Sequence, residues 1–187
     1  MVGYTIEELQ SILIKYNIKQ DPVVKIMAYC LRDNHYHFII QEIIEGGIVK
    51  FMQRLGDSYG KFFSIKYDTP GSLFQGRYKS VIVKNNEQLQ HLLMYVNIIN
   101  PAENINPKMK ERGVRDVEKT WEYVEGYTFG SHPEYNGQRI SPLIDRGILG
   151  KLFKDANYYR DFAKDALNGK EFNNIKLLSD THPVFVT

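Results

Sequence analysis

The sequence of 187 residues has little of several things, and each shortage excludes a class of protein. Cys30 is the only cysteine, so one chain can form neither a disulfide framework nor a cysteine-rich zinc site. No apolar run approaches the length of a membrane span, and the N-terminus lacks the apolar segment of a signal peptide. These absences predict a cytoplasmic protein that has no membrane partner.

The chain also has little net charge, +2, so it is not a polycation as a whole. Its 43% hydrophobic and 25% charged residues are typical of an ordinary globular protein. One segment is nevertheless basic, with seven cationic residues against Asp57 and Asp68. This segment could bind a phosphate backbone, or it could be a solvated surface. Its cationic residues are Lys50, Arg54, Lys61, Lys66, Arg77, Lys79 and Lys84.

Hydrophobic periodicity predicts an α-β-β-α-β-α order of elements followed by a helical tail. We therefore expect an α+β fold, with an antiparallel sheet covered by helices and a mainly helical C-terminal extension. The division would fall at about residue 110, giving domains 1–110 and 111–187. The expected elements are a helix over 5–17, strands over 23–31 and 35–44, a helix over 48–67, a strand over 73–83, a helix over 87–97 capped by Asn86 and ended by Pro101, helices within 116–126 and 146–167, and an irregular end.

The sharpest local feature is the pair of histidines in Asn34-His35-Tyr36-His37. Residues two apart in a strand point to the same face, so His35 and His37 present neighbouring imidazoles. Such a pair can ligate a divalent cation and leave positions open for a substrate phosphate. The alternative is a pair of half-buried histidines that bond to backbone or water.

A tyrosine near the end of the helix over 87–97, Tyr95, gains interest from this pair. A lone helical tyrosine usually packs in the core. Beside a metal site, however, a phenol can attack a phosphodiester and keep the bond energy in a covalent intermediate.

Three ordered segments carry a resemblance to a known family. Residues 28–40 (AYCLRDNHYHFII) resemble the hairpin that bears the HUH motif in REP-associated tyrosine transposases. Residues 71–80 (GSLFQGRYKS) resemble the strand ahead of their catalytic helix, and 92–96 (LLMYV) followed by Asn100-Pro101 resembles that helix's end. Residues 51–55 (FMQRL) fit the intervening helix. Three motifs in order are far more specific than one.

The resemblance implies an HUH endonuclease with a ferredoxin-like or RRM-like core. Such an enzyme cuts and rejoins single-stranded DNA at hairpin-associated sites and uses magnesium or manganese. His35 and His37 would be metal ligands, and Tyr95 would form a 5′-phosphotyrosine. Arg54, Arg77 and Lys79 would contact DNA, and a homodimer is compatible with the family.

Two departures from the family pattern bear on activity. The chain begins almost at the first helix, so we expect the usual first strand to be missing and the domain to be truncated, or its sheet to be completed by a partner chain. The helix also has one extra residue between Tyr95 and the Asn-Pro pair. A ligand four positions after Tyr95 would share its face, but that residue is Ile99; a local π-bulge or the end of the helix could bring Asn100 back, and Asn97 is another weak candidate.

Three functions remain open from sequence alone. The first is a transposase that cleaves and transfers DNA. The second is a DNA-hairpin-binding protein derived from such an enzyme but no longer catalytic. The third is a metal-free interaction protein whose paired histidines are structural.

Overall fold

The computed structural model describes residues 21–74, 76–169 and 183–186, together with the isolated residues 8, 11 and 15. The helix predicted over 5–17 therefore lies almost wholly outside the described residues, although positions 8, 11 and 15 are helical. The fold is α+β, as predicted.

A β-hairpin forms the first part of the sheet and carries both histidines of the motif. Strand β1 (Val24–Leu31) pairs antiparallel with β2 (Tyr36–Glu42), and Cys30 lies opposite His37. The polar residues Arg32, Asp33 and Asn34 lie in the connection between the two strands. The β-branched and apolar residues of both strands favour extended structure because their side chains pack on a pleated surface.

The remaining two strands correct the prediction. Strand β3 spans only Lys79–Ile82, because Gly76 adopts a φ of +110°, which interrupts the segment expected to be extended over 73–83. The C-terminal end was expected to be irregular, yet Pro183–Val186 forms β4. It lies between β2 and β3 and pairs parallel with both, in the order β1-β2-β4-β3. The sheet is therefore mixed, with its antiparallel part confined to the hairpin.

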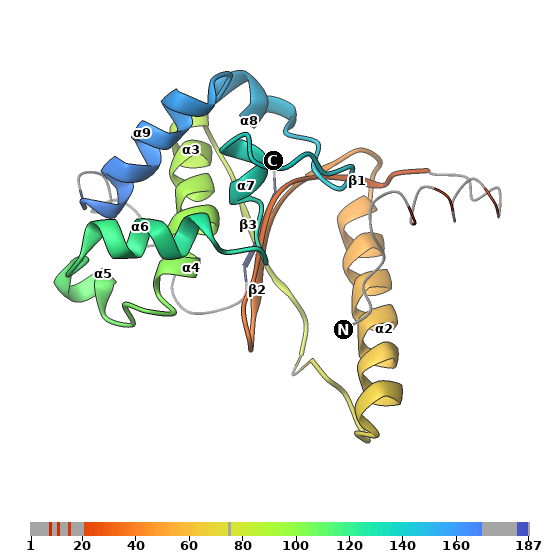
Figure 1. The fold of residues 1–187 in the computed structure, drawn as a ribbon. Helices are drawn as coiled ribbons and strands as arrows, with labels where there is room; N and C mark the ends of the chain where they lie inside the picture. The colour runs from red at the N-terminus through yellow and green to blue at the C-terminus, as the bar shows by residue number, and fades with distance from the viewer. Residues whose placement is uncertain are drawn as a thin grey trace.

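The side chains of β2 alternate between two separate cores, one on each face of the sheet. Ile39 joins the larger core with Leu93 and other residues of the C-terminal half, whereas Phe38 and Ile40 join a smaller core with helix α2 (Gly47–Tyr67). Figure 1 shows α2 on one side of the sheet and the remaining helices on the other. The sheet therefore separates two surfaces of different construction.

The helices of the larger core follow β3 along the chain. Asn85, rather than the predicted Asn86, caps the first of them, since its side chain accepts a hydrogen bond from the Gln88 backbone N–H. Within the part of the chain that the structure describes, no helix is both long and apolar enough to cross a membrane. These helices are α3 (Asn86–Met94), the π-helix η1 (Tyr95–Ile99), α4 (Asn100–Ala102), α5 (Met109–Arg112), α6 (Val117–Glu125), α7 (His132–Tyr135), α8 (Gly147–Leu152) and α9 (Ala156–Leu167).

Candidate active site

The two histidines of the motif lie side by side at the start of β2. The ring centroids of His35 and His37 are 5.1 Å apart, with the rings at 85° to each other. His37 is buried at 2% exposure, whereas His35 is only partly covered. The strand geometry therefore brings both imidazoles to one face, as their spacing predicted.

Hydrogen bonds fix the orientation of the His35 ring. Its Nδ1 lies 2.7 Å from the side-chain oxygen of Asn34. Because an amide oxygen only accepts, Nδ1 carries the proton and Nε2 holds the lone pair. Metal-binding histidines are commonly oriented in this way by a hydrogen bond to their other ring nitrogen.

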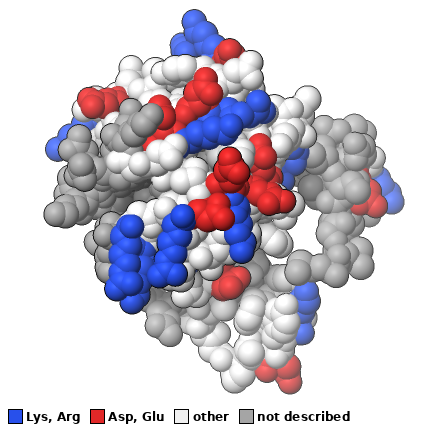
Figure 2. All heavy atoms as spheres, turned by 60° about the vertical axis from the view of Figure 1, so that its left-hand side comes forward, with Lys and Arg blue, Asp and Glu red and all other residues white. Residues whose placement is uncertain are grey.

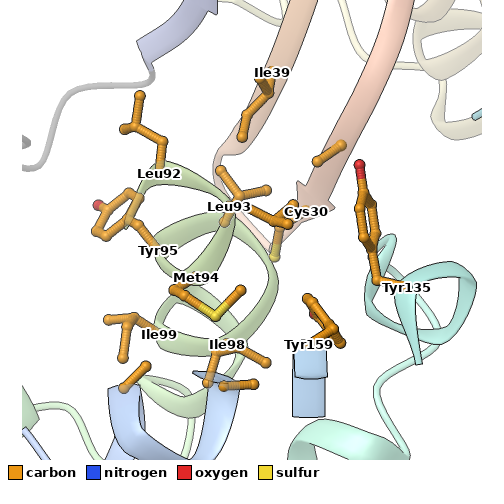
Figure 3. Close-up of a cluster of buried hydrophobic side chains, with 14 of the residues drawn as sticks. Cys30, Ile39, Leu92, Leu93, Met94, Tyr95, Ile98, Ile99, Tyr135 and Tyr159 are labelled. Carbon is orange, nitrogen blue, oxygen red and sulfur yellow. The ribbon is translucent and has the colours of Figure 1, made fainter. Parts of the chain in front are cut away.

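Tyr95, the first residue of the π-helix η1, packs its ring against His37 of this pair. Its ring centroid is 5.4 Å from that of His37, with the rings edge to face. Figure 3 shows Leu93 pointing toward the strands and Cys30, while Leu92 and Tyr95 lie at another side of the helix. Tyr95 is 3% exposed. The structure thus brings the candidate nucleophile and the histidine pair together, although nearly buried.

A π-turn follows Tyr95 directly. The backbone N–H of Asn100 donates to the Tyr95 carbonyl, five residues back, so the turn holds one residue more than an α-turn. Of the two arrangements that the spacing left open, a π-bulge and a helix end, the structure has the π-bulge. The predicted helix end at Pro101 is wrong, because Pro101 occupies the first turn of α4, where no donor N–H is needed.

The π-turn also settles how the two asparagines of this segment are used. Both side-chain amide atoms of Asn97 are hydrogen bonded. Its Oδ1 accepts from Ser131 Oγ at 2.7 Å, and its Nδ2 donates to the Tyr159 hydroxyl at 3.2 Å. Asn100 donates through Nδ2 to the Tyr95 carbonyl at 3.2 Å. Its Oδ1 is buried and accepts no hydrogen bond from any residue that the structure describes. Asn100 therefore offers the open acceptor, and Asn97 does not.

Buried polar side chains from the region of α7 and from α9 form hydrogen bonds with the π-helix and with one another. Tyr159 is fully buried, and its hydroxyl also meets His132 Nδ1 at 2.9 Å. Burial raises the pKa of Tyr159, so its hydroxyl stays protonated. Burial, helped by Arg160, lowers the pKa of His132 to about 4, so this imidazole is neutral at pH 7. His132 therefore has a structural role in this core.

An ion pair joins the histidine hairpin to the segment after Tyr95. Arg32 donates to Glu103 at 2.9 Å and to the Asn104 side chain at 3.0 Å, and its guanidinium lies 3.5 Å from His35 Nε2. Both partners of the pair are mostly covered. Because the partners are 71 positions apart, no local pattern in the sequence could have revealed this link.

The donors present fit a divalent cation in part. Among the described residues, no group of three or more His, Cys, Asp and Glu side chains is arranged to hold a metal. Cys30 lies opposite His37, but burial raises its thiol pKa to about 12, so it stays protonated and packs as an apolar group. The side chains of the kinds that a divalent cation accepts are the two neighbouring imidazoles and, in the π-turn segment, the open amide oxygen of Asn100.

The residues predicted to contact DNA lie apart from this centre. Arg54 is exposed on α2, on the opposite face of the sheet. Arg77 and Lys79 are exposed too, but Arg77 precedes β3, although the strand predicted over 73–83 included both residues. The short β3 is the cause.

The comparison with known families matches just over half of the chain. Residues 3–98 match the family described as IS200-like transposases, and the match ends inside the π-helix. No curated protein and no solved structure matches the chain. The matched segment contains the histidine pair, α2 and Tyr95. The chain therefore belongs to the IS200-like transposase family.

Proposed function

We propose that this transposase family member is a metal-dependent endonuclease and strand transferase for single-stranded DNA, acting beside hairpins. The observation that supports it most directly is the contact of Tyr95 with His37, whose ring centroids are 5.4 Å apart. A phenol in contact with a candidate metal ligand is suited to attack a phosphate held at that metal.

The proposed reaction balances within the DNA and one side chain. The Tyr95 oxygen, after losing its proton, attacks a backbone phosphorus and forms a phosphotyrosine at the 5′ end. The bond from phosphorus to the 3′ oxygen breaks, and that oxygen takes up a proton as a free 3′-OH. Attack by a 3′-OH on the phosphotyrosine reverses these changes and joins two strands.

His35, His37 and Asn100 are the residues that would hold magnesium or manganese. A divalent cation would supply positive charge to polarise the phosphate and stabilise the charge that develops on it. The Asn34 side chain keeps the lone pair of His35 on Nε2, and the π-turn keeps the amide of Asn100 against Tyr95. These contacts orient donors before any substrate arrives.

Burial of the site favours a second candidate, a DNA-hairpin-binding protein that no longer cleaves. Tyr95 is 3% exposed and His37 is 2% exposed, so DNA reaches the phenol only after local opening. In a homodimer, opening and closing could accompany exchange of elements between copies.

The test is a covalent-adduct assay on the full chain with labelled hairpin DNA and magnesium or manganese. We expect an adduct that survives denaturation and is lost completely in Tyr95→Phe, which keeps the ring beside His37. Tyr123→Phe is the matched control and should keep the adduct. Salt-sensitive DNA binding without any adduct would support the second candidate instead.

Metal binding is tested separately by titrating manganese and following the heat. Asn100→Leu, which preserves side-chain size, should weaken binding by about tenfold, in the range seen when groups around a metal are removed. The control is Asn157→Leu, an exposed asparagine at the start of α9. Equal manganese affinity in wild type and Asn100→Leu would remove Asn100 from the ligand set.

A further inference from the structure

Helix α2 is packed along only part of its length. Its buried residues, Gly47, Ile48 and Met52, all lie in the first half. Figure 1 shows the helix running out beyond the sheet. From Asp57 to Tyr67 every residue of the helix is described and none is buried. The far half of α2 therefore contributes little to the core.

This far half is unusually aromatic for an exposed helix. Tyr59, Phe62 and Tyr67 are 48%, 54% and 52% exposed. Lys66 Nζ lies 5.4 Å from the centroid of Phe62 and 5.3 Å from that of Tyr67. Exposed rings interleaved with a cation form the kind of surface on which nucleobases stack.

The rings form a continuous line from α2 to the start of β2, on the face of the sheet opposite His37 and Tyr95. Phe62 contacts Tyr59 at a centroid distance of 6.2 Å, and Tyr59 contacts Phe74 at 6.3 Å. Phe74 contacts Tyr36 at 5.9 Å. Tyr36 is the residue between His35 and His37. We call these four residues, Phe62, Tyr59, Phe74 and Tyr36, the aromatic track.

Beside the track, the chain folds around a hollow of about 160 Å³. Phe63 and Ser64 of α2 line it on one side, and residues 69–73 line it on the other. It offers room for a planar group next to the exposed rings. Phe63 is the aromatic residue of its lining, and the remaining lining residues are small, polar or aliphatic.

Charge on α2 favours a polyanion. The helix carries four exposed basic side chains and one acidic residue, Asp57. The surface of the C-terminal helices differs, since Figure 2 shows basic and acidic side chains interleaved there. A second copy docked through α2 would bring two basic helices together, which costs free energy. The four are Lys50, Arg54, Lys61 and Lys66, and Arg77 and Lys79 extend the set after the track.

We propose that the aromatic track and these cations bind single-stranded DNA flanking the cleavage site. Bases stack on Phe62 and Tyr59, phosphates pair with Lys61 and Lys66, and the strand passes over the hairpin end to His35. The inference rests on the proposed function only in naming this strand as the substrate; the surface itself is defined by rings and charge.

The test measures binding of a fluorescein-labelled oligothymidylate by anisotropy, in a Tyr95→Phe background that excludes covalent capture. Phe62→Ala should weaken binding by about tenfold, as expected for loss of one stacked base. Phe62→Trp should restore it. Ile65→Ala is the matched control, because Ile65 lies on the same stretch of α2 at 74% exposure but has no ring. Lys66→Ala should lower the slope of log affinity against log salt by about one.

Three results would overturn the inference. Phe62→Ala could leave the affinity unchanged, or Ile65→Ala could weaken binding as much as Phe62→Ala. Sedimentation could also reveal a dimer that Phe62→Ala dissociates while DNA binding persists, which would make the surface a contact between copies. An adduct at Tyr95 without any dependence on the track would reject this inference and keep the proposed function. DNA binding that depends on the Phe62 ring, without any adduct at Tyr95, would keep this inference and reject the proposed cleavage function.

Discussion

The two faces of the sheet differ in whether their functional side chains are buried or exposed. On the face of His37 and Tyr95, polar side chains are buried and tied to partners far away in the chain, as Asn97 is to Ser131 and Tyr159. On the face of α2, rings such as Phe62 are exposed beside cations. The first face fixes atoms in place, and the second presents an adaptable surface.

We propose that this difference separates DNA cleavage, on the first face, from DNA binding, on the second. Phosphoryl transfer needs reacting groups held within fractions of an ångström, which buried and fully bonded side chains provide. A flexible single strand needs contacts that tolerate many sequences, and every base has a face that stacks on an aromatic ring. We therefore expect substitutions on the first face to lower stability, and those on the second to lower DNA affinity.

The largest stability effect should come from Asn97→Ala, with a loss of about 3 kcal/mol. The change removes two buried hydrogen bonds, from Ser131 to Asn97 and from Asn97 to Tyr159, and each lost buried bond costs roughly 1–3 kcal/mol. Urea unfolding measures it, with the exposed Asn157→Ala as control. A double-mutant cycle with Ser131→Ala should show strong coupling; additive losses would mean that the two side chains act independently.

Low pH should reduce folding stability through His132, which is buried on the same face of the sheet. The unfolded ring takes a proton near pH 6.5, whereas the folded ring resists protonation until about pH 4. Between these values the unfolded state binds more protons, so stability falls as pH falls, by about 2 kcal/mol at pH 5 relative to pH 7. Unfolding curves of His132→Gln should lack this part of the loss. The partly exposed His91→Gln serves as control, and an unchanged pH profile in His132→Gln would contradict the assignment.

A smaller loss of folding stability should follow from removing one hydrogen bond between Tyr127 and the hairpin that carries the histidines. The Tyr127 hydroxyl donates to the Leu31 carbonyl at 2.5 Å, and burial raises the pKa of Tyr127 to about 12. Tyr127→Phe should cost about 1 kcal/mol in thermal or urea unfolding. The exposed Tyr158→Phe should cost less. Equal effects of the two changes would show that this hydrogen bond does not hold the hairpin.

The smallest stability effects should appear on α2. Phe62→Ala and Ile65→Ala remove side chains that are 54% and 74% exposed, so each should change the free energy of unfolding by less than about 0.5 kcal/mol. Chemical denaturation measures both. A loss of 2 kcal/mol or more in Phe62→Ala would mean that the ring packs in the folded core, and would erase the contrast between the two faces.

Local sequence patterns predicted much of the fold because they depend on short-range geometry. Alternation along residues 35–44 indicated a strand that presents both histidines to one face, and helical spacing over 48–67 indicated α2. The extra residue between Tyr95 and Asn100 indicated a local irregularity, a π-bulge or a helix end, since an insertion in a packed helix must be absorbed locally. Strand lengths were less predictable, because Gly76 interrupts the strand expected over 73–83 in a stretch otherwise rich in strand formers.

The sequence by itself determined which chemistry was available: neighbouring imidazoles, a phenol on a helix, and cations near rings. Only the tertiary structure decided which groups meet. It made Asn100 rather than Asn97 the open acceptor, joined Arg32 to Glu103, placed β4 between β2 and β3, and aligned Phe62, Tyr59, Phe74 and Tyr36 in one track. The reason is physical: period and spacing fix the direction of a side chain within its own element, whereas its partners come from elements distant in sequence that pack only in the complete fold.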